Sequence, residues 1–369
     1  MKIKKVLQKI FKNFFKFIFH ILYGKIKLIN DKSNILFKKQ SIKKIIISGK
    51  EYITNHQIYE LIDTRIYTDL VEHVAIIKNN FILPEISYQQ IGGELKQVSE
   101  NKVLKSGTTR LIKKYDGNVL SLVQGASGNN YFHFLFDIIV KIKLFEEKYS
   151  LEDIDYFYMP GTNEWQKKII SKFGIYENRL INSQKFRHIK ADKVFALDHP
   201  WYRKDKVQKE IQNLPDWIIH YLRDKFLKYS KKFEASDKIY IDRSDSYFNH
   251  CKLINNQEVI NFLSSFGFKS YQVSKLDFFE QIYLFNNART IIGPHGAAFS
   301  NIIFSEPGLK LIELMPEGHP SIKCKKISSI LNFDYTKVNL KYFSNSKKDI
   351  KGDMKISIDH LKDILKALN

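Results

Sequence analysis

The sequence has little cysteine, proline or glycine: its 369 residues include only 2 Cys, 8 Pro and 16 Gly. Two cysteines, Cys251 and Cys324, exclude a disulfide scaffold and a cysteine-based zinc site, and they fit a reducing compartment. So few Pro and Gly exclude a collagen-like chain and long linkers. Because a domain takes roughly 100–200 residues, we expect two domains.

Acidic residues are scarce relative to basic ones, 39 against 60, so the formal net charge is +21. A charge of this sign attracts polyanions such as nucleic acid, anionic lipid or nucleoside diphosphates. The Lys excess also accompanies abundant Asn, Ile, Phe and Tyr, which is typical of A/T-biased codons. The basic residues are spread along the chain without a zinc-finger, RRM or basic heptad pattern. We therefore do not expect a nucleic-acid partner.

Long hydrophobic runs are missing from the N-terminal region, residues 1–30. The longest, Phe17–Tyr23, is interrupted by His20 and falls short of the ~20 residues that span a bilayer, and no signal-peptide cleavage pattern follows. Apolar residues recur at helical spacing, with lysines mostly between them. The pattern predicts a basic amphipathic helix on an anionic membrane surface, at the cytoplasmic face of the cell membrane. A helix packed on its own domain or on a second subunit is the alternative.

Strand and helix patterns alternate in the rest of the chain. The first series is strand 119–123, the loop QGASGNN, the helix YFHFLFDIIVKIKLFEEK, the strand DIDYFYMP, a helix capped by Asn163 and the strand KADKVFAL. The second series is strand 238–243, helix 257–266 capped by Asn256, strand 268–273, helix 277–287 behind a Ser274–Asp277 capping box, strand 290–293, a short helix to Phe304 and strand 309–314. Both orders predict parallel sheets covered by helices, as in Rossmann-like domains.

The loop between strand 290–293 and the short helix, GPHGAA, is the strongest chemical feature of the sequence. Its small residues allow a ligand to approach the backbone, and the start of the helix presents free N–H groups. His295, Ser300 and Asn301 add side-chain donors. This pattern favours an anion site, although a tight turn between strand and helix needs glycine in any case.

Three segments carry a resemblance to a known family. The run ARTIIGPHGAAFSNIIFSEPGLKLIELMP resembles the hallmark segment of glycosyltransferase family 61, and GNNYFHFLFDIIVKIKLFE resembles its upstream helix. A weaker likeness runs from IDRSD through KLINNQEV to FEQIYLFNNA. Together they span 118–316. Members of the family include bacterial capsular polysaccharide proteins, plant xylosyltransferases and animal O-linked N-acetylglucosaminyltransferases.

The resemblance implies a GT-B-like α/β fold with two Rossmann-like domains facing a central cleft. We expect the basic helix at 1–30, an acceptor-side domain at 31–215, a nucleotide-sugar domain at 216–345, and a tail with a helix at 346–369. It also implies inverting sugar transfer from a nucleotide-sugar, with a UDP-sugar expected and no metal or other cofactor. The acceptor would be a capsular or other surface polysaccharide, carried on a membrane lipid.

The resemblance also assigns residues. Those expected to bind the nucleotide-sugar are Arg243, Lys252, His295, Gly296, Ala297, Ser300, Asn301 and Glu313. Lys252 stands where relatives carry arginines, and Lys gives a phosphate only a point charge. Glu313, at a strand end, would accept hydrogen bonds from ribose hydroxyls.

Inversion needs a base for the acceptor hydroxyl. His133 and Asp137 lie four residues apart on one predicted helix, so they share a face and can form a base with its orienting carboxylate. The aromatic neighbours also fit a buried, merely hydrogen-bonded histidine. Glu94, Asp116 and Asp242 remain alternative bases.

Motifs typical of other enzyme classes are missing from the sequence or stand in the wrong place. Asp153 and Asp155 have the letters of a metal-binding Asp-x-Asp, but they precede a predicted strand instead of following it. Dinucleotide, Walker A and nucleophile-elbow motifs are missing. A polysaccharide pyruvyltransferase of similar architecture and a non-catalytic scaffold on the membrane stay open as alternatives.

Overall fold

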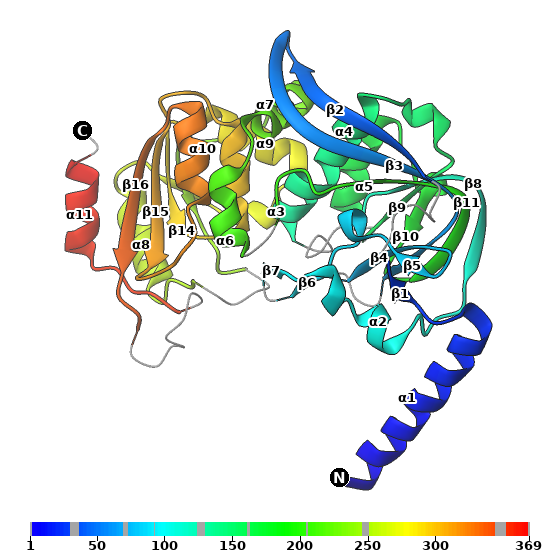
Figure 1. Ribbon diagram of the computed structural model, residues 1–369. Coiled ribbons are helices and arrows are strands. Elements are labelled where there is room, and N and C mark those ends of the chain that lie inside the picture. The colour runs from blue at the N-terminus through cyan, green and yellow to red at the C-terminus, as the bar shows by residue number, and fades with distance from the viewer. Residues whose placement is uncertain are drawn as a thin grey trace. The chain divides into compact units, whose positions relative to one another are not determined.

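The computed structural model describes residues 2–29, 37–68, 73–91, 93–123, 130–160, 163–203, 206–245, 251–343 and 352–367. The chain divides into two compact units, Met1–Glu210 and Ile211–Asn369 (Figure 1). Each unit contains a sheet with its own buried apolar cluster. The fold class is mixed α/β, as the alternation of strand and helix patterns predicted.

The first unit is built on a large mixed sheet. Its strands, with the small pair β6 and β7, are β1 (Lys27–Leu28), β2 (Lys38–Ile47), β3 (Lys50–Thr68), β4 (Val74–Lys78), β5 (Phe81–Ile82), β6 (Gln90–Ile91), β7 (Glu94–Leu95), β8 (Lys113–Ser121), β9 (Tyr156–Met159), β10 (Leu180–Asn182) and β11 (His188–Leu197). The order is β1-β5-β4-β3-β11-β8-β9-β10, and β2 pairs with β3.

Strands β11, β8 and β9 are parallel neighbours, which confirms the predicted βαβ series, and the unpredicted β10 extends it beside β9. The sheet then continues through β3, which is antiparallel to β11, β2 and β4. The predicted parallel sheet is therefore only half of the observed one. The 50–68 segment is rich in Ile, Tyr and Thr, which favour the extended backbone that the antiparallel half of the sheet needs.

The helices of the first unit are α1 (Lys2–Tyr23), α2 (Lys102–Ser106), α3 (Tyr131–His133), α4 (Val140–Glu146), α5 (Glu164–Ile170) and α6 (Val207–Glu210), with the short η2 (Pro84–Ile86), η3 (Val98–Glu100), η5 (Leu151–Asp153), η6 (Ser171–Phe173) and η7 (Glu177–Arg179). In the sequence, helices α3, α4 and α5 stand between parallel strands. The predicted helix from Tyr131 is not one regular α-helix: a π-helical segment, η4 (Phe134–Ile139), separates α3 from α4. All six residues of η4 are buried. Such π segments are rare and often occur at functional sites.

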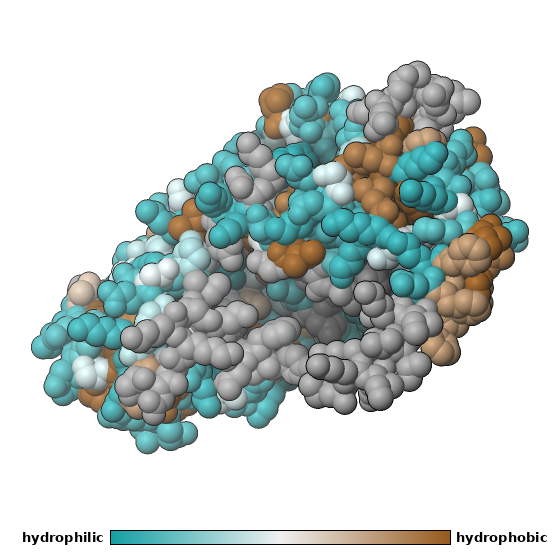
Figure 2. All heavy atoms as spheres, turned by 60° about the horizontal axis from the view of Figure 1, so that its bottom comes forward, coloured by the Kyte–Doolittle hydropathy of each residue, from teal (hydrophilic) through white to brown (hydrophobic). Residues whose placement is uncertain are grey.

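Helix α1 ends against the sheet of its own unit. The Tyr23 hydroxyl accepts a hydrogen bond from the backbone N–H of Ile112 (3.2 Å), and its ring lies edge-on to that of His188. Toward the N-terminus, Phe11, Phe14 and Phe17 are more than half exposed. Figure 2 shows hydrophobic patches of this kind on an otherwise largely hydrophilic face. Among the described residues, no helix has the length and apolar character needed to cross a membrane.

The second unit contains a five-stranded parallel sheet in the order β13-β12-β14-β15-β16. Its strands are β12 (Lys238–Ile241), β13 (Lys269–Tyr271), β14 (Thr290–Pro294), β15 (Lys310–Pro316) and β16 (Asp334–Leu340). Its helices are α7 (Asp216–Phe226), α8 (Asn256–Ser264), α9 (Phe278–Asn287), α10 (Lys323–Leu331) and α11 (Ile358–Lys366), with the short η8 (Ile211–Asn213), η9 (Leu227–Tyr229), η10 (Val273–Lys275) and the 3₁₀-helical η11 (Ala297–Phe304).

Two local predictions in this unit were wrong in detail. The N-cap position of α8 is Asn255, whose side chain donates to Glu258 without capping the helix, and the Asn256 side chain bonds Asp242 and Tyr240 instead. The capping box of α9 is Asp277–Glu280, because Asp277 accepts from the helix N–H groups and Glu280 reaches back to the Asp277 N–H. The predicted short helix after the GPHGAA loop is confirmed: it is η11, a 3₁₀ helix that ends at Phe304.

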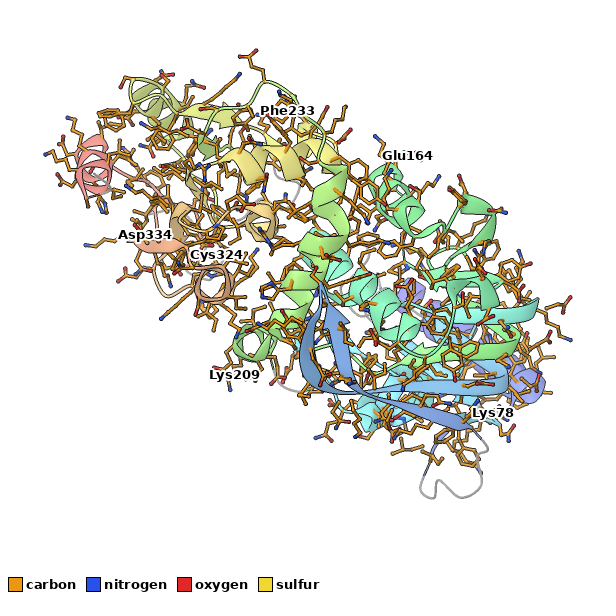
Figure 3. The ribbon with its side chains drawn as sticks, turned by 90° about the horizontal axis from the view of Figure 1, so that it is seen from above. Lys78, Glu164, Lys209, Phe233, Cys324 and Asp334 are labelled. Carbon is orange, nitrogen blue, oxygen red and sulfur yellow. The ribbon has the colours of Figure 1, made fainter. Side chains whose placement is uncertain are left out.

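Two elements after Pro316 were not predicted. Helix α10 carries Cys324 and strand β16 begins at Asp334, both labelled in Figure 3. The C-terminal α11 places Leu361 and Leu365 in the apolar cluster of this unit. The predicted domain limits near residues 30, 215 and 345 stay predictions.

Candidate active site

Asp137 is the centre of a buried polar cluster in the first unit. It lies in η4 and is fully buried. The Nδ1 atom of His133 is 2.7 Å from its Oδ2 atom, so the predicted pair is in direct contact. The indole N–H of Trp201 donates to Oδ1 (2.8 Å), and Nε2 of His199 lies 3.7 Å from Oδ2. Three ring N–H groups thus face one carboxylate.

The electrostatics of this cluster keep the carboxylate ionised. Burial by itself would raise the pKa of Asp137, but the charges and hydrogen bonds of His133 and His199 outweigh it and hold the pKa far below its ordinary value. Burial lowers the pKa of His199 to about 4, so that ring is neutral near pH 7. Its Nδ1 accepts from the backbone N–H of Tyr202 (2.9 Å), which leaves the ring proton on Nε2, toward Asp137.

His133 is therefore oriented as a base would be. Because ionised Asp137 accepts only, the Nδ1 atom of His133 carries the donated proton and the lone pair is on Nε2. The His133 side chain is 9% exposed. The loop that precedes α3, residues 124–129, lies outside the described residues.

Sequence reasoning missed His199, Trp201 and Lys141. The signal for the first two was the segment DHPWY directly after a predicted strand, where side chains at the carboxyl end of a parallel strand reach a ligand site. Lys141 is fully buried and donates to the Val123 carbonyl (3.3 Å), and burial lowers its pKa to about 8. No pattern in the helix marked this lysine, since it sits in an otherwise apolar stretch.

A second polar cluster surrounds the GPHGAA loop in the second unit. Arg243 follows β12, and its guanidinium donates to the backbone carbonyl of His295, which follows β14. A Cβ atom on Gly296 would lie 2.5 Å from Cζ of Arg243. A side chain at residue 296 would therefore displace the Arg243 guanidinium, whereas the φ of 173° is ordinary extended backbone.

Lys323 is a further cation at the same loop. It begins α10, is buried, and its Nζ atom donates to the Gly296 carbonyl (3.0 Å) and to the Ser300 hydroxyl (3.4 Å). Burial lowers the pKa of Lys323 and of Arg243. Sequence reasoning missed Lys323, because it lies outside the motif on an element that was not predicted.

Glu313 is buried in β15 and bonded to His295. Its Oε1 atom lies 2.5 Å from Nδ1 of His295 and accepts from Cys324 (3.1 Å), and its Oε2 atom accepts from the Tyr335 hydroxyl (2.8 Å). Burial would raise the pKa of Glu313, but these hydrogen bonds and the His295 charge lower it to about 2. Burial lowers the pKa of His295 despite Glu313. Contact of Glu313 with ribose stays a prediction.

The remaining predicted residues do not all lie in this second cluster. Ala297 is exposed at the first position of η11. Asn301 is buried and its side-chain amide donates to Gln281 (2.8 Å), so it faces α9. The Lys252 side chain is exposed, while its backbone carbonyl accepts from Met354 (2.7 Å). Arg243, His295, Gly296, Ser300 and Glu313 are thus brought together, whereas the exposed Lys252 side chain makes no hydrogen bond to them within the described part of the chain.

The three alternative bases have other surroundings. Asp242 accepts hydrogen bonds from Ser244, Asn256 and Gln272. Glu94 pairs with Lys96 (2.8 Å), and Asp116 is exposed. Within the described ranges, no three His, Cys, Asp or Glu side chains gather as a metal site.

The comparison with known families agrees with this geometry. Residues 131–312 match the sequence profile of Glycosyltransferase 61. The matched segment includes His133, Asp137, Arg243 and His295, hence the central residues of both clusters. No curated protein matches the chain. Because of this match and of the three sequence segments described above, the chain belongs to glycosyltransferase family 61.

Proposed function

We propose that this glycosyltransferase is an inverting, metal-independent enzyme that transfers a sugar from a UDP-sugar to a saccharide acceptor. Membership of the family makes the chain a glycosyltransferase, which takes a sugar donor and an acceptor. The finer assignment rests on one observation: two cations, the half-buried Arg243 and the buried Lys323, converge on the backbone of residues 295 and 296. In the proposed GT-B arrangement the second unit binds the donor.

The donor diphosphate would lie at this loop. Arg243 can hold two phosphate oxygens, and Lys323 adds a point charge. The N–H groups at the start of η11, beside exposed Ala297, supply further donors. Preorganised positive charge stabilises the charge that develops on the leaving diphosphate, which is the work that Mg²⁺ performs in other transferases. We therefore propose that no metal is needed.

His133 would take the proton of the acceptor hydroxyl as it attacks the anomeric carbon. The Asp137 contact at 2.7 Å fixes the ring with its lone pair on Nε2 and stabilises the imidazolium that forms. The glycosidic bond to the donor phosphate breaks as the new bond forms on the opposite face, and the nucleoside diphosphate leaves. Asp137, His199 and Trp201 act by positioning His133.

Membrane attachment through residues 1–30 is part of the proposal. The exposed Phe11, Phe14 and Phe17 of α1 support burial in a headgroup region, and the lysines of this segment favour anionic lipid. The protein would then act at the cytoplasmic face of a bacterial membrane. A lipid-linked precursor of a capsular or other surface polysaccharide would meet the enzyme there at high effective concentration.

Donor binding is the test of this function. UDP and other nucleoside diphosphates should stabilise the protein thermally in the presence of EDTA, by about 2.7 kcal/mol at one hundred times the dissociation constant. Arg243→Ala should weaken UDP binding strongly. Arg289→Ala is the matched control, because Arg289 is an exposed arginine of the same unit. Strict dependence of UDP binding on a divalent ion would exclude metal-free transfer.

A further inference from the structure

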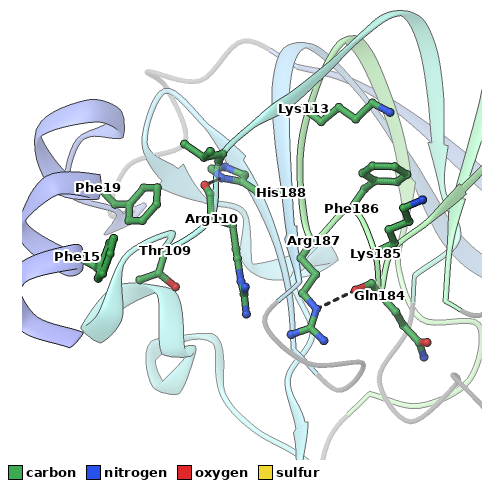
Figure 4. Close-up of a pocket in the computed structure, with 11 residues that line it drawn as sticks. Phe15, Phe19, Thr109, Arg110, Lys113, Gln184, Lys185, Phe186, Arg187 and His188 are labelled. Carbon is green, nitrogen blue, oxygen red and sulfur yellow. Dashed lines mark hydrogen bonds between the residues drawn. The ribbon is translucent and has the colours of Figure 1, made fainter. Parts of the chain in front are cut away.

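A pocket of about 640 Å³ lies beside α1 in the first unit, away from the Asp137 cluster. Phe15 and Phe19 of α1 form one side of it. The other side comes from the segment that leads into β8 and from the segment that leads into β11 (Figure 4). Neither segment contributes a residue to the proposed chemistry, so the pocket has no role in the function described so far.

The pocket is strongly basic. Four of its described lining residues carry positive charge: Arg110, Lys113, Lys185 and Arg187. No carboxylate is among the described lining residues. Figure 4 shows the Arg110 and Arg187 side chains extending in the same direction, and Arg187 is held by a hydrogen bond from Nε to the Gln184 carbonyl (3.0 Å). Four cations around one cavity favour an anionic ligand.

The pocket is also apolar at its α1 side. Phe15 is 45% exposed, and Leu111, which also lines the pocket, is 75% exposed. The Lys113 ammonium lies 4.0 Å from the centre of the Phe186 ring, so charged and aromatic surfaces alternate within the cavity. A small inorganic anion would leave the aromatic side chains unused, and a hydrocarbon would leave the cations unpaired. A ligand with a phosphate and an acyl chain uses both.

We propose that this pocket binds the phosphate headgroup of an anionic membrane lipid, with the acyl chains against Phe15 and Phe19. The inference rests on the proposed attachment of α1 and adds a defined headgroup site to it. Arginine binds phosphate oxygens through paired N–H groups, which fits Arg110 beside Arg187. The lipid would fix the orientation of α1 on the membrane through a contact more selective than surface charge alone.

The test uses the full-length protein and three soluble probes below their micelle concentrations, in NMR titrations. The probes are dihexanoylphosphatidylglycerol, dihexanoylphosphatidylcholine and glycerol 3-phosphate. The anionic lipid should bind at least about tenfold more tightly than the other two, because it alone combines a net negative charge with acyl chains. Equal binding of the phosphatidylcholine analogue overturns the headgroup site. Equal binding of glycerol 3-phosphate assigns the pocket to a free phosphate ester and overturns the lipid.

Charge-matched double variants locate the binding. The double variant Arg110→Ala with Lys185→Ala should weaken binding of the anionic lipid about tenfold or more. Lys50→Ala with Lys148→Ala removes the same charge from exposed positions of the same unit and should change the affinity less than twofold. Equal losses in both double variants overturn the proposal. Sugar transfer to a soluble acceptor is measured on the same proteins and should be unchanged, so a failure of the proposed reaction is seen separately.

Discussion

The Nδ1 atom of His133 lies 2.7 Å from the Oδ2 atom of Asp137, across the junction between α3 and the π-helical η4. The Trp201 indole holds the other carboxylate oxygen, so the carboxylate cannot rotate away from His133 without losing a buried hydrogen bond. A histidine fixed in this way has one tautomer and one direction for its free lone pair.

The first prediction concerns this histidine. His133→Ala should lower turnover by roughly the 10²–10⁴-fold typical of a lost general base. UDP affinity should change little, because the proposed phosphate contacts belong to Arg243 and Lys323. Steady-state kinetics and UDP titration separate the two effects.

The control is His360→Ala, which removes an exposed histidine of α11 and should leave turnover unchanged. Full activity of His133→Ala would contradict its role as base. Unfolding of that variant, with His133→Gln folded and active, would support a buried structural histidine.

The second prediction concerns the acid stability given by Asp137. Its pKa is lower in the folded protein than the ordinary value of about 3.9. Its stabilisation is therefore fully present above about pH 4 and is lost as the pH falls through the folded pKa. Asp137→Asn should cost about 1.5–3 kcal/mol at pH 7. The gap in unfolding free energy between wild type and variant should narrow toward pH 3. Urea unfolding at several pH values measures both, and a gap that is constant with pH would contradict the prediction.

The third prediction concerns the space around Gly296. Gly296→Ala places a Cβ atom 2.5 Å from the Arg243 guanidinium, which must move. UDP affinity should fall about tenfold or more, as expected for a displaced charged hydrogen bond. Ala367→Ser is the control, because residue 367 is exposed in the same unit and lies outside the GPHGAA loop. Calorimetric titration of UDP into both variants measures the two affinities. Unchanged UDP affinity of Gly296→Ala would show that Arg243 does not belong to the phosphate site.

The sequence was sufficient for most of the parallel strands, though not for β10 and β16, and for the His133–Asp137 pair, because short-range periodicity determines both. It was insufficient for η4, since a π-helical turn has no periodic signature distinct from that of an α-helix. It was also insufficient for His199, Trp201 and Lys323. These residues join their clusters through contacts between elements that are distant in the sequence, such as Trp201 on Asp137. Tertiary pairing, which local patterns do not encode, also placed β3 against β11.

The fourth prediction concerns the pH dependence of donor binding. Burial and the nearby Lys323 and Arg243 charges lower the pKa of His295 below its ordinary value of about 6.5. A bound diphosphate would offset those charges and raise this pKa, so binding should take up a proton. UDP affinity should then increase as the pH falls from about 8 toward 6. Calorimetry in two buffers of different ionisation enthalpy measures the proton uptake.

The matched variant is His295→Asn, which should bind UDP without proton uptake. Glu313 does not contribute in this range, since its pKa of about 2 keeps it ionised throughout. Equal proton uptake in His295→Asn and wild type would assign the titration to another group.

The last prediction concerns the exposed face of α1. Phe14, Phe17 and Ile21 are 59%, 65% and 70% exposed, whereas Tyr23 is bonded to the body of the unit. Deleting the whole helix would therefore remove structural contacts as well, and substitutions on the exposed face are the sharper experiment. Phe14→Asp with Phe17→Asp should abolish sedimentation with phosphatidylglycerol vesicles, because the apolar face can no longer enter the headgroup region. Transfer to a soluble acceptor should survive.

Ile53→Asp with Ile62→Asp is the control, since both isoleucines are exposed on β3 of the same unit, at 81% and 64%. It adds the same negative charge at a place where we expect no membrane contact, so vesicle binding should persist. High salt should weaken attachment of the wild type, because lysines of residues 1–30 each add about 1 kcal/mol near an anionic surface. If the Phe14 and Phe17 variant still sediments with vesicles, or if both variants lose binding equally, α1 is not the membrane anchor and its exposed face belongs to a protein interface.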